Sequence, residues 1–288
     1  MIRRFATGVA LATGLALSLT GCLGEAGNKV DEAGKNLKLS AAQVLGKAAE
    51  KTDQVDSFKA DLSMQMTGSE DGDVTMNGDM QYRMKPDLAY RMHFGEMMVA
   101  GRQMGGGEQI LLGSNIYIKL PSLPGGGGSS GKPWIKMSLD EIGKKAGVNF
   151  DKLLQQSQQM DPVQNTKLLT ASKDAREVGK ENVDGVETTH YTGTYRIEDA
   201  VAKLPPESQE MYRTGMAQTG MENMHFDLWV DDQQLPRKVA LKSQGTAVGA
   251  LNMTIKYHDF GKPVQITAPP ESQVTDFGEM LNGLGGGS

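Results

Sequence analysis

Between Phe58 and Phe94 apolar residues recur at every second position, and this alternation constrains the fold more than any other feature of the chain. Successive side chains of a β-strand point to opposite faces of a sheet, so strict alternation predicts strands with one apolar and one polar face. Turn residues at 71–72 and 85–87 divide the run into three strands. We therefore expect an antiparallel meander with one face in water and the other face covered.

The apolar positions of these strands are rich in methionine, of which the chain has 18. Methionine is unbranched and polarizable, so it adapts to irregular apolar shapes. Two interpretations remain open: an ordinary core that happens to use methionine, or an adaptable lining for an acyl chain. Under the second interpretation the predicted ligand-binding residues are Met64, Met66, Met76, Met80, Tyr82, Met92, Phe94, Ile118, Phe226, Leu228, Met253 and Ile255.

The rest of the chain alternates between strand-like and helical segments. Ser40 is a predicted N-cap for a helix whose apolar stripe runs from Ala41 to Ala49. Because no composition break divides 40–275, we expect one α+β domain there. Strands are predicted at 97–104, 109–113, 115–120, 133–138, 175–181, 186–196, 224–230, 236–243 and 250–260, and helices at 139–145, 151–160, 161–169, 197–203 and 206–218.

The N-terminus has the three parts of an export signal: Arg3 and Arg4, an apolar run over 5–19, and small residues before Cys22. Leu-Thr-Gly-Cys at 19–22 resembles the bacterial lipobox, which implies that the Cys22 thiol carries a lipid anchor. The predicted organisation is a signal peptide at 1–21, a lipidated tether at 22–39, the domain at 40–275 and a disordered tail at 276–288. The predicted location is the extracytoplasmic face of the cell membrane.

The overall charge of the chain bears on its partners. The formal net charge is −5, and removing Arg3 and Arg4 with the signal gives −5 − 2 = −7. A mildly acidic chain gives no reason to expect nucleic acid as a partner. Cys22 is the only cysteine, so no internal disulfide can form. No cofactor or metal site is predicted, and we expect a monomer.

Several motifs resemble catalytic or metal sites only in part. The stretch 127–131 satisfies G-x-S-x-G, but a strand-like segment follows it where a nucleophile elbow needs a helix. The stretch 126–132 resembles a phosphate loop, but Pro133 stands where Ser or Thr should follow. None of the four histidines has a second histidine at ligand spacing. We therefore predict no catalytic residue, and we interpret the Gly-rich loop at 124–131 as a surface loop that could gate a cavity.

Three motifs carry a resemblance to a known group of proteins. The segment 57–61 after a helix, and 228–231 followed by 235–239, resemble the LolA/LolB superfamily of lipoprotein carriers. The ending Tyr257-His258-Asp259-Phe260-Gly261-Lys262-Pro263-Val264, running into Ala268-Pro269-Pro270, is closer to the LppX/LprG-type lipoproteins of actinobacteria. The resemblance covers about 40–272. It implies a curved antiparallel half-barrel with helices over its concave face and an apolar cavity between them.

From the lining, the anchor and the resemblance we predict a membrane-anchored lipoprotein without catalysis. It would bind an acylated lipid or glycolipid and move it across the cell envelope, together with a transport partner there. Two rival functions remain open. A sensor or regulatory module could use the same half-barrel as an interaction surface, and a hydrolase could hide its carboxylates among the 35 acidic residues.

Overall fold

We analysed a computed structural model of the chain. It describes residues 39–68, 72–119, 132–140, 165–204, 206–243, 249–278 and 280. The chain divides into two compact units, 1–38 and 39–288, and every described residue belongs to the second unit. Its described elements are α1 (Ala41–Asp53), β1 (Ser57–Thr67), β2 (Val74–Arg83), β3 (Ala89–Phe94), β4 (Met97–Val99), β5 (Arg102–Met104), β6 (Gly107–Leu112), β7 (Asn115–Lys119), β8 (Trp134–Ser138), α4 (Asn165–Leu169), β9 (Arg176–Val183), β10 (Val186–Arg196), α5 (Ile197–Val201), α6 (Pro206–Thr219), β11 (Asn223–Val230), β12 (Pro236–Lys242), β13 (Ala250–His258), a 3₁₀ turn (Glu271–Gln273) and β14 (Val274–Asp276).

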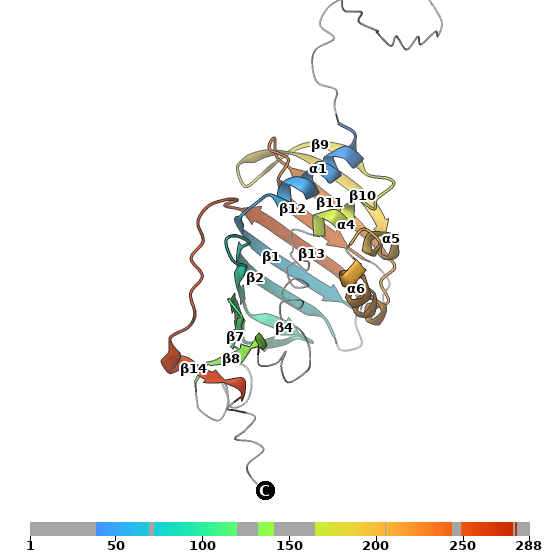
Figure 1. Cartoon of the computed structure of the whole chain (residues 1–288). Coiled ribbons are helices and arrows are strands. Elements are labelled where there is room, and N and C mark those ends of the chain that lie inside the picture. The colour runs from blue at the N-terminus through green and yellow to red at the C-terminus, as the bar shows by residue number, and fades with distance from the viewer. Residues whose placement is uncertain are drawn as a thin grey trace, which may run out of the picture. The chain divides into compact units, whose positions relative to one another are not determined.

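One open sheet organises the unit. Its strand order is β14-β8-β7-β6-β3-β2-β1-β13-β12-β11-β10-β9, with the β4–β5 hairpin attached to β2. Every pair is antiparallel except β14 with β8. The order does not return on itself, so the sheet is a curved half-barrel and the predicted α+β fold class is confirmed (Figure 1).

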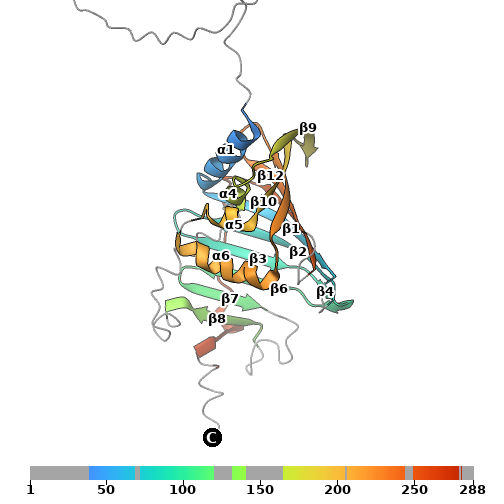
Figure 2. The same ribbon diagram turned by 90° about the vertical axis from the view of Figure 1, so that its right-hand side faces the viewer.

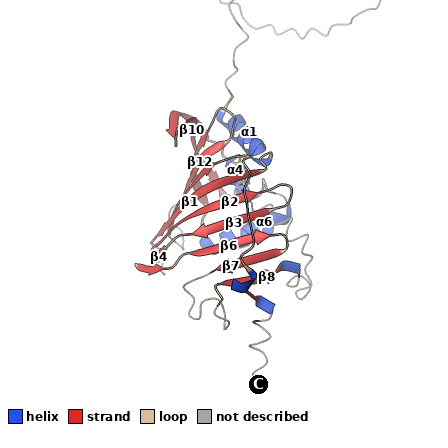
Figure 3. Ribbon diagram, turned by 90° about the vertical axis from the view of Figure 1, so that its left-hand side faces the viewer, coloured by secondary structure: helices blue, strands red, loops and turns tan. Residues whose placement is uncertain are grey.

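Helices α1, α4, α5 and α6 lie on one side of the sheet (Figure 2), and from the opposite side the strands lie mainly in front of the helices (Figure 3). Helix α1 begins where the sequence predicts, because the Ser40 hydroxyl accepts a hydrogen bond from the Gln43 N–H at 3.3 Å. The Gln43 side chain accepts in return from the Ser40 N–H at 2.9 Å, which completes a capping box. The apolar stripe of α1, with Leu45 and Ala48 fully buried, belongs to the same core cluster as Phe58 and Ala60 of the sheet.

A small apolar cluster covers part of the convex face. Ala89, Ile110 and Trp134 meet Val264 and Ile266, which come from the irregular segment after β13. That segment then runs along the edge of the sheet as β14, where Val274 lies opposite Trp134. Neither this cover nor β14 was predicted, because the segment shows no alternation. Strand β14 also extends one residue past the predicted domain boundary at 275.

One strand prediction was wrong. The run 97–104 is a hairpin of two short strands instead of one strand, because Ala100 and Gly101 form a turn with positive φ values of 49° and 74°. Glycine adopts such values without steric cost. The remaining strands lie within a few residues of their predicted positions where they are described. The helix predicted at 151–160 and most of the one predicted at 139–145 lie outside the described residues.

Candidate functional site

The register of the sheet brings the twelve predicted lining residues onto one face. Met64 lies opposite both Met76 and Met253, and Met80 lies opposite Met92. Directly opposed residues of neighbouring strands point to the same face, with Cβ atoms about 4.5–5.5 Å apart. This is the face that α1 covers, so the alternation correctly identified the concave side. Contact with a ligand stays a prediction for all twelve residues.

About half of this face is filled by protein. Met80, Tyr82, Phe226, Leu228 and Ile255 are each at most 5% exposed and belong to the main core. The Phe226 ring lies over Gly193, where an added Cβ would come within 2.9 Å of ring atoms. These five predicted lining residues therefore act as core residues in the described structure.

The other half of the face is covered less. Its side chains are only half-buried, and several lie near the far ends of β1, β2 and β13: Met64, Met66, Met76, Met92, Phe94, Ile118, Leu251 and Met253. Met64, Met76 and Met253 occupy neighbouring positions on three strands in the middle of the sheet. We call the eight half-buried residues named above the methionine surface.

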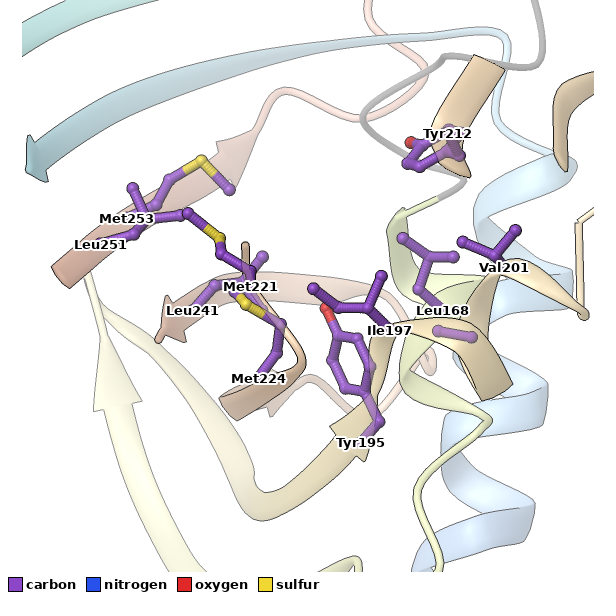
Figure 4. A pocket seen from close by; sticks show the side chains of 11 residues that line it. Leu168, Tyr195, Ile197, Val201, Tyr212, Met221, Met224, Leu241, Leu251 and Met253 are labelled. Atoms are coloured by element: carbon purple, nitrogen blue, oxygen red, sulfur yellow. The ribbon is translucent and has the colours of Figure 1, made fainter. Parts of the chain in front are cut away.

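An apolar cavity of about 170 Å³ borders the methionine surface (Figure 4). The cavity and the surface share Leu251 and Met253, which lie opposite Met66 and Met64. None of the lining residues carries a formal charge, and the two tyrosines are the only ones among them with a polar side chain. The lining consists of Leu168, Tyr195, Ile197, Ala200, Val201, Tyr212, Met221, Met224, Leu241, Leu251 and Met253.

The two phenols of the cavity are held in their neutral form. Burial raises the pKa of Tyr195, and the nearby Tyr212 raises it further. Burial also raises the pKa of Tyr212. Because removing a group from water disfavours its charged form, these hydroxyls stay protonated at any physiological pH. The cavity can thus take an apolar chain and offers no charge to hold an ion.

The helical wall of the cavity is built where β10 ends. The chain passes directly from Arg196 into α5, and the Ile197 N–H donates to the Glu222 carbonyl at 2.9 Å. This bond ties the start of α5 to the loop before β11, which supplies Met221. Ala200 and Val201 are buried within α5 and complete this wall.

Of the predicted lining residues, only Met253 lines this cavity. The others that line it come mainly from α4, α5, α6 and the start of β11, which the strand alternation does not cover. A signal for part of them was present: Ile197, Ala200, Val201 and Leu204 recur at helical spacing and form one apolar stripe.

A polar cleft of about 590 Å³ lies beside the cavity. Met224 lines both, while Gly220, Glu222 and Asn223 line the cleft and Met221 lines the cavity. The segment 220–224 therefore separates an apolar space from a polar one. Thr194, His225, Lys242 and Ser243 complete the cleft.

A histidine cluster occupies the convex side of β9, β10 and β11. His190 Nδ1 lies 2.9 Å from Glu181 Oε1, and its Nε2 lies 2.9 Å from Asp227 Oδ1. The His190 ring stacks on Trp229, with 4.3 Å between ring centroids, and the Trp229 N–H donates to Glu181 at 2.7 Å. Burial opposes ionisation of Asp227, but hydrogen bonds from His190 and Thr192 and the charge of nearby histidines lower its pKa overall. These contacts fasten the edge strand β9 to the sheet.

No described group of three or more His, Cys, Asp or Glu residues could hold a metal ion. Among the same described residues, no helix is long and apolar enough to cross a membrane. Cys22 with its signal and almost all of its tether, the Gly-rich loop at 124–131, and the tail from 281 onward lie outside the described residues.

Two curated proteins of Streptomyces are similar to part of this chain in sequence. No protein-family model matches the chain. A 31.2 kDa protein of Streptomyces griseus, named uncharacterized, is 35% identical over 156 residues, which are 53% of this chain and 51% of that protein. A protein of Streptomyces coelicolor named "Putative lipoprotein" is 31% identical over 158 residues, which are 54% of this chain and 46% of that protein. The chain spans about half the length of the curated relatives it matches.

Two mycobacterial lipoproteins are among the similar solved structures. LppX of Mycobacterium tuberculosis aligns with 79% of this chain and 98% of its own, at 17% identity and a TM-score of 0.47. LprF of Mycobacterium bovis aligns with 80% of this chain and 96% of its own, at 14% identity and a TM-score of 0.46. LppX is a lipoprotein of the type that the motifs at the end of the domain resemble.

Proposed function

We propose that this chain binds the acyl part of a lipid or glycolipid and carries it within the cell envelope, without catalysis, while Cys22 anchors it to the membrane. The observation that supports the proposal most is the uncharged cavity that continues into the methionine surface through Leu251 and Met253. Flexible methionines can adapt to acyl chains of different length and shape.

The volume of the cavity limits how a chain would bind. At about 170 Å³ it is smaller than the roughly 300–1,000 Å³ of typical ligand pockets. We therefore propose that one end of the acyl chain enters the cavity while the rest lies along the methionine surface. Burying a methylene group from water contributes about 0.8 kcal/mol, so a partly covered chain gains free energy in proportion to the methylene groups that the protein covers. The polar cleft beyond 220–224 would suit the polar part of such an amphiphile.

Native mass spectrometry of residues 23–288, produced without the anchor in a lipid-containing bacterial host, tests the proposal. Discrete adducts that extract into organic solvent are the expected result, because any co-purified acyl mass must then come from the folded unit. A bare protein mass, repeated after exposure to envelope lipids, would contradict the proposal and favour the sensor module.

A pair of variants on β13 locates the site. Met253→Trp places a large ring between the cavity and the methionine surface, so the adducts should largely disappear while the melting temperature changes little. Asn252→Trp is the matched control. Asn252 precedes Met253 on the same strand, is exposed and points to the opposite face of the sheet. Equal loading of both variants would show that lipid binds elsewhere.

A further inference from the structure

The β4–β5 hairpin is attached to the sheet at one short contact. Val99 lies opposite Val74 and Met98 opposite Thr75, and among the described residues β5 pairs with β4 alone. The Ala100 N–H donates to the Asp73 carbonyl at 2.9 Å, which holds the base of the turn. Figure 2 shows β4 where the strands of the sheet end, away from helices α1, α4, α5 and α6. The hairpin therefore stands clear of the main core.

Exposed methionines mark this hairpin. Met98 is 40% exposed and Met104 is 41% exposed. Among the described residues, the only other large hydrophobic side chain so exposed is Val178, on the edge strand β9. Met104 lies opposite Met97, on the face that also carries Val99, whereas Met98 points to the other face. Each face of the hairpin thus carries an exposed methionine, beside Arg102 on the first face and Gln103 on the other. Large apolar side chains exposed together at one place are a feature of interaction surfaces.

A row of apolar residues connects the hairpin to the cavity. Leu251 lines the cavity and lies opposite Met66, Met66 lies opposite Val74, and Val74 lies opposite Val99. These four residues share one face of the sheet and are nearest neighbours on successive strands. Along this row the concave face is therefore apolar from the cavity to Val99 of the hairpin.

We propose that the β4–β5 hairpin inserts Met98 and Met104 into the surface of a lipid layer and is the lip over which an acyl chain passes to or from the cavity. The inference rests on the proposed function. The hairpin would then set both the surface that meets the membrane and the direction of the path.

The size and charge of the hairpin favour a lipid layer over a protein. A specific protein interface buries about 800 Å² on each partner, which a hairpin this short cannot supply. Arg102 is exposed on β5, but Asp73 lies at the turn and Glu96 is exposed just before β4, so the hairpin carries no net positive charge that would attract anionic headgroups. Apolar insertion does not depend on charge, so the contact should persist at high salt.

Flotation with phosphatidylcholine vesicles tests the proposal on residues 23–288, which contain the whole second unit. We expect the unmodified chain to float with the vesicles at low and high salt. The double variant Met98→Asp/Met104→Asp should bind the vesicles with an affinity at least about ten-fold lower, because two exposed apolar side chains are replaced by charges. Val178→Asp is the matched control and should bind as the unmodified chain does, because Val178 lies on the remote edge strand.

A second measurement separates this inference from the proposed function. Binding of decanoate from solution, where no vesicle is present, should be equal in the unmodified chain and the double variant. Loss of decanoate binding in both chains would overturn the proposed function. Retained decanoate binding, with no flotation or with equal flotation of the double variant, would overturn the hairpin alone. A dimer that the double variant abolishes in sedimentation would also overturn it, because a second copy would then be the partner.

Discussion

The two ends of the concave face use the same alternation for different purposes. At the end beneath α1, the Phe58 ring stacks on Tyr82 with 5.2 Å between centroids and meets Tyr257 edge-on at 5.7 Å. At the other end the same face carries the half-buried methionines that border the cavity. Rings of fixed shape fill space completely, whereas methionines leave it adaptable. The comparison teaches that the position along a strand, and not its alternation, separates the filled core from the half-buried methionine surface.

The largest effect on stability is expected at the end of the concave face that holds the rings of Phe58, Tyr82 and Tyr257, which we call the aromatic end. Phe58→Ala should lower the free energy of unfolding by about 3–5 kcal/mol, because Phe58 is fully buried and its removal leaves a cavity. Met64→Ala, on the same strand and face but half-buried, should cost about 1 kcal/mol. Urea unfolding of both variants checks the difference. Equal losses would mean that the two ends are packed alike.

A smaller effect on stability is expected from Asp227, on the convex side of the sheet behind the core residues of β11. Asp227 lies between the core residues Phe226 and Leu228 but points to the convex side, where it accepts from His190. Asp227→Asn should cost about 1–3 kcal/mol near pH 7, because a charge-assisted hydrogen bond is lost. The pKa of Asp227 is lowered in the fold, so this stability is present above the unfolded pKa of about 4 and is lost as pH falls through the folded pKa.

The difference between the Asp227→Asn variant and the unmodified chain should therefore shrink on acidification below about pH 4. Urea titrations at several pH values measure it. A difference that stays constant down to the acid transition would show that Asp227 acts through packing instead of charge.

The smallest effect is expected at a surface ion pair of the aromatic end. Lys85 Nζ lies 2.7 Å from Asp56 Oδ1, but both side chains are more than 60% exposed. Lys85→Ala should change the free energy of unfolding by less than about 0.5 kcal/mol, because water and salt screen exposed pairs. A loss comparable to that of Phe58→Ala in the same urea assay would show that the stability of this end does not come from its rings.

The face to which each strand residue points could be predicted from the sequence. Strict period two and the turns between the strands are enough to place Met64, Met80 and Met253 on one side of the sheet. Which of these residues are covered could not be predicted in this way. Cover depends on where α1 and α5 lie along the strands, and this is a tertiary contact that strand periodicity does not contain.

The helical wall of the cavity and the hairpin were missed for local reasons. The cavity residues Ile197 and Val201 lie at helical spacing, so the alternation that marks the strand residues does not extend to them. The 97–104 run has apolar residues on both sides of Ala100-Gly101, so composition favoured one continuous strand. Gly101 was the signal for the turn, since a two-residue hairpin loop favours glycine.

The pairing of β1 with β13 has a consequence for how the chain is made. Lys59 lies opposite His258, so the middle of the sheet joins an early strand to a late one. During synthesis β1 cannot pair with β13 until the residues up to His258 have left the ribosome. Pairings between residues so distant in sequence form slowly. The middle of the sheet thus stays incomplete on one side of β1 until β13 has been synthesised.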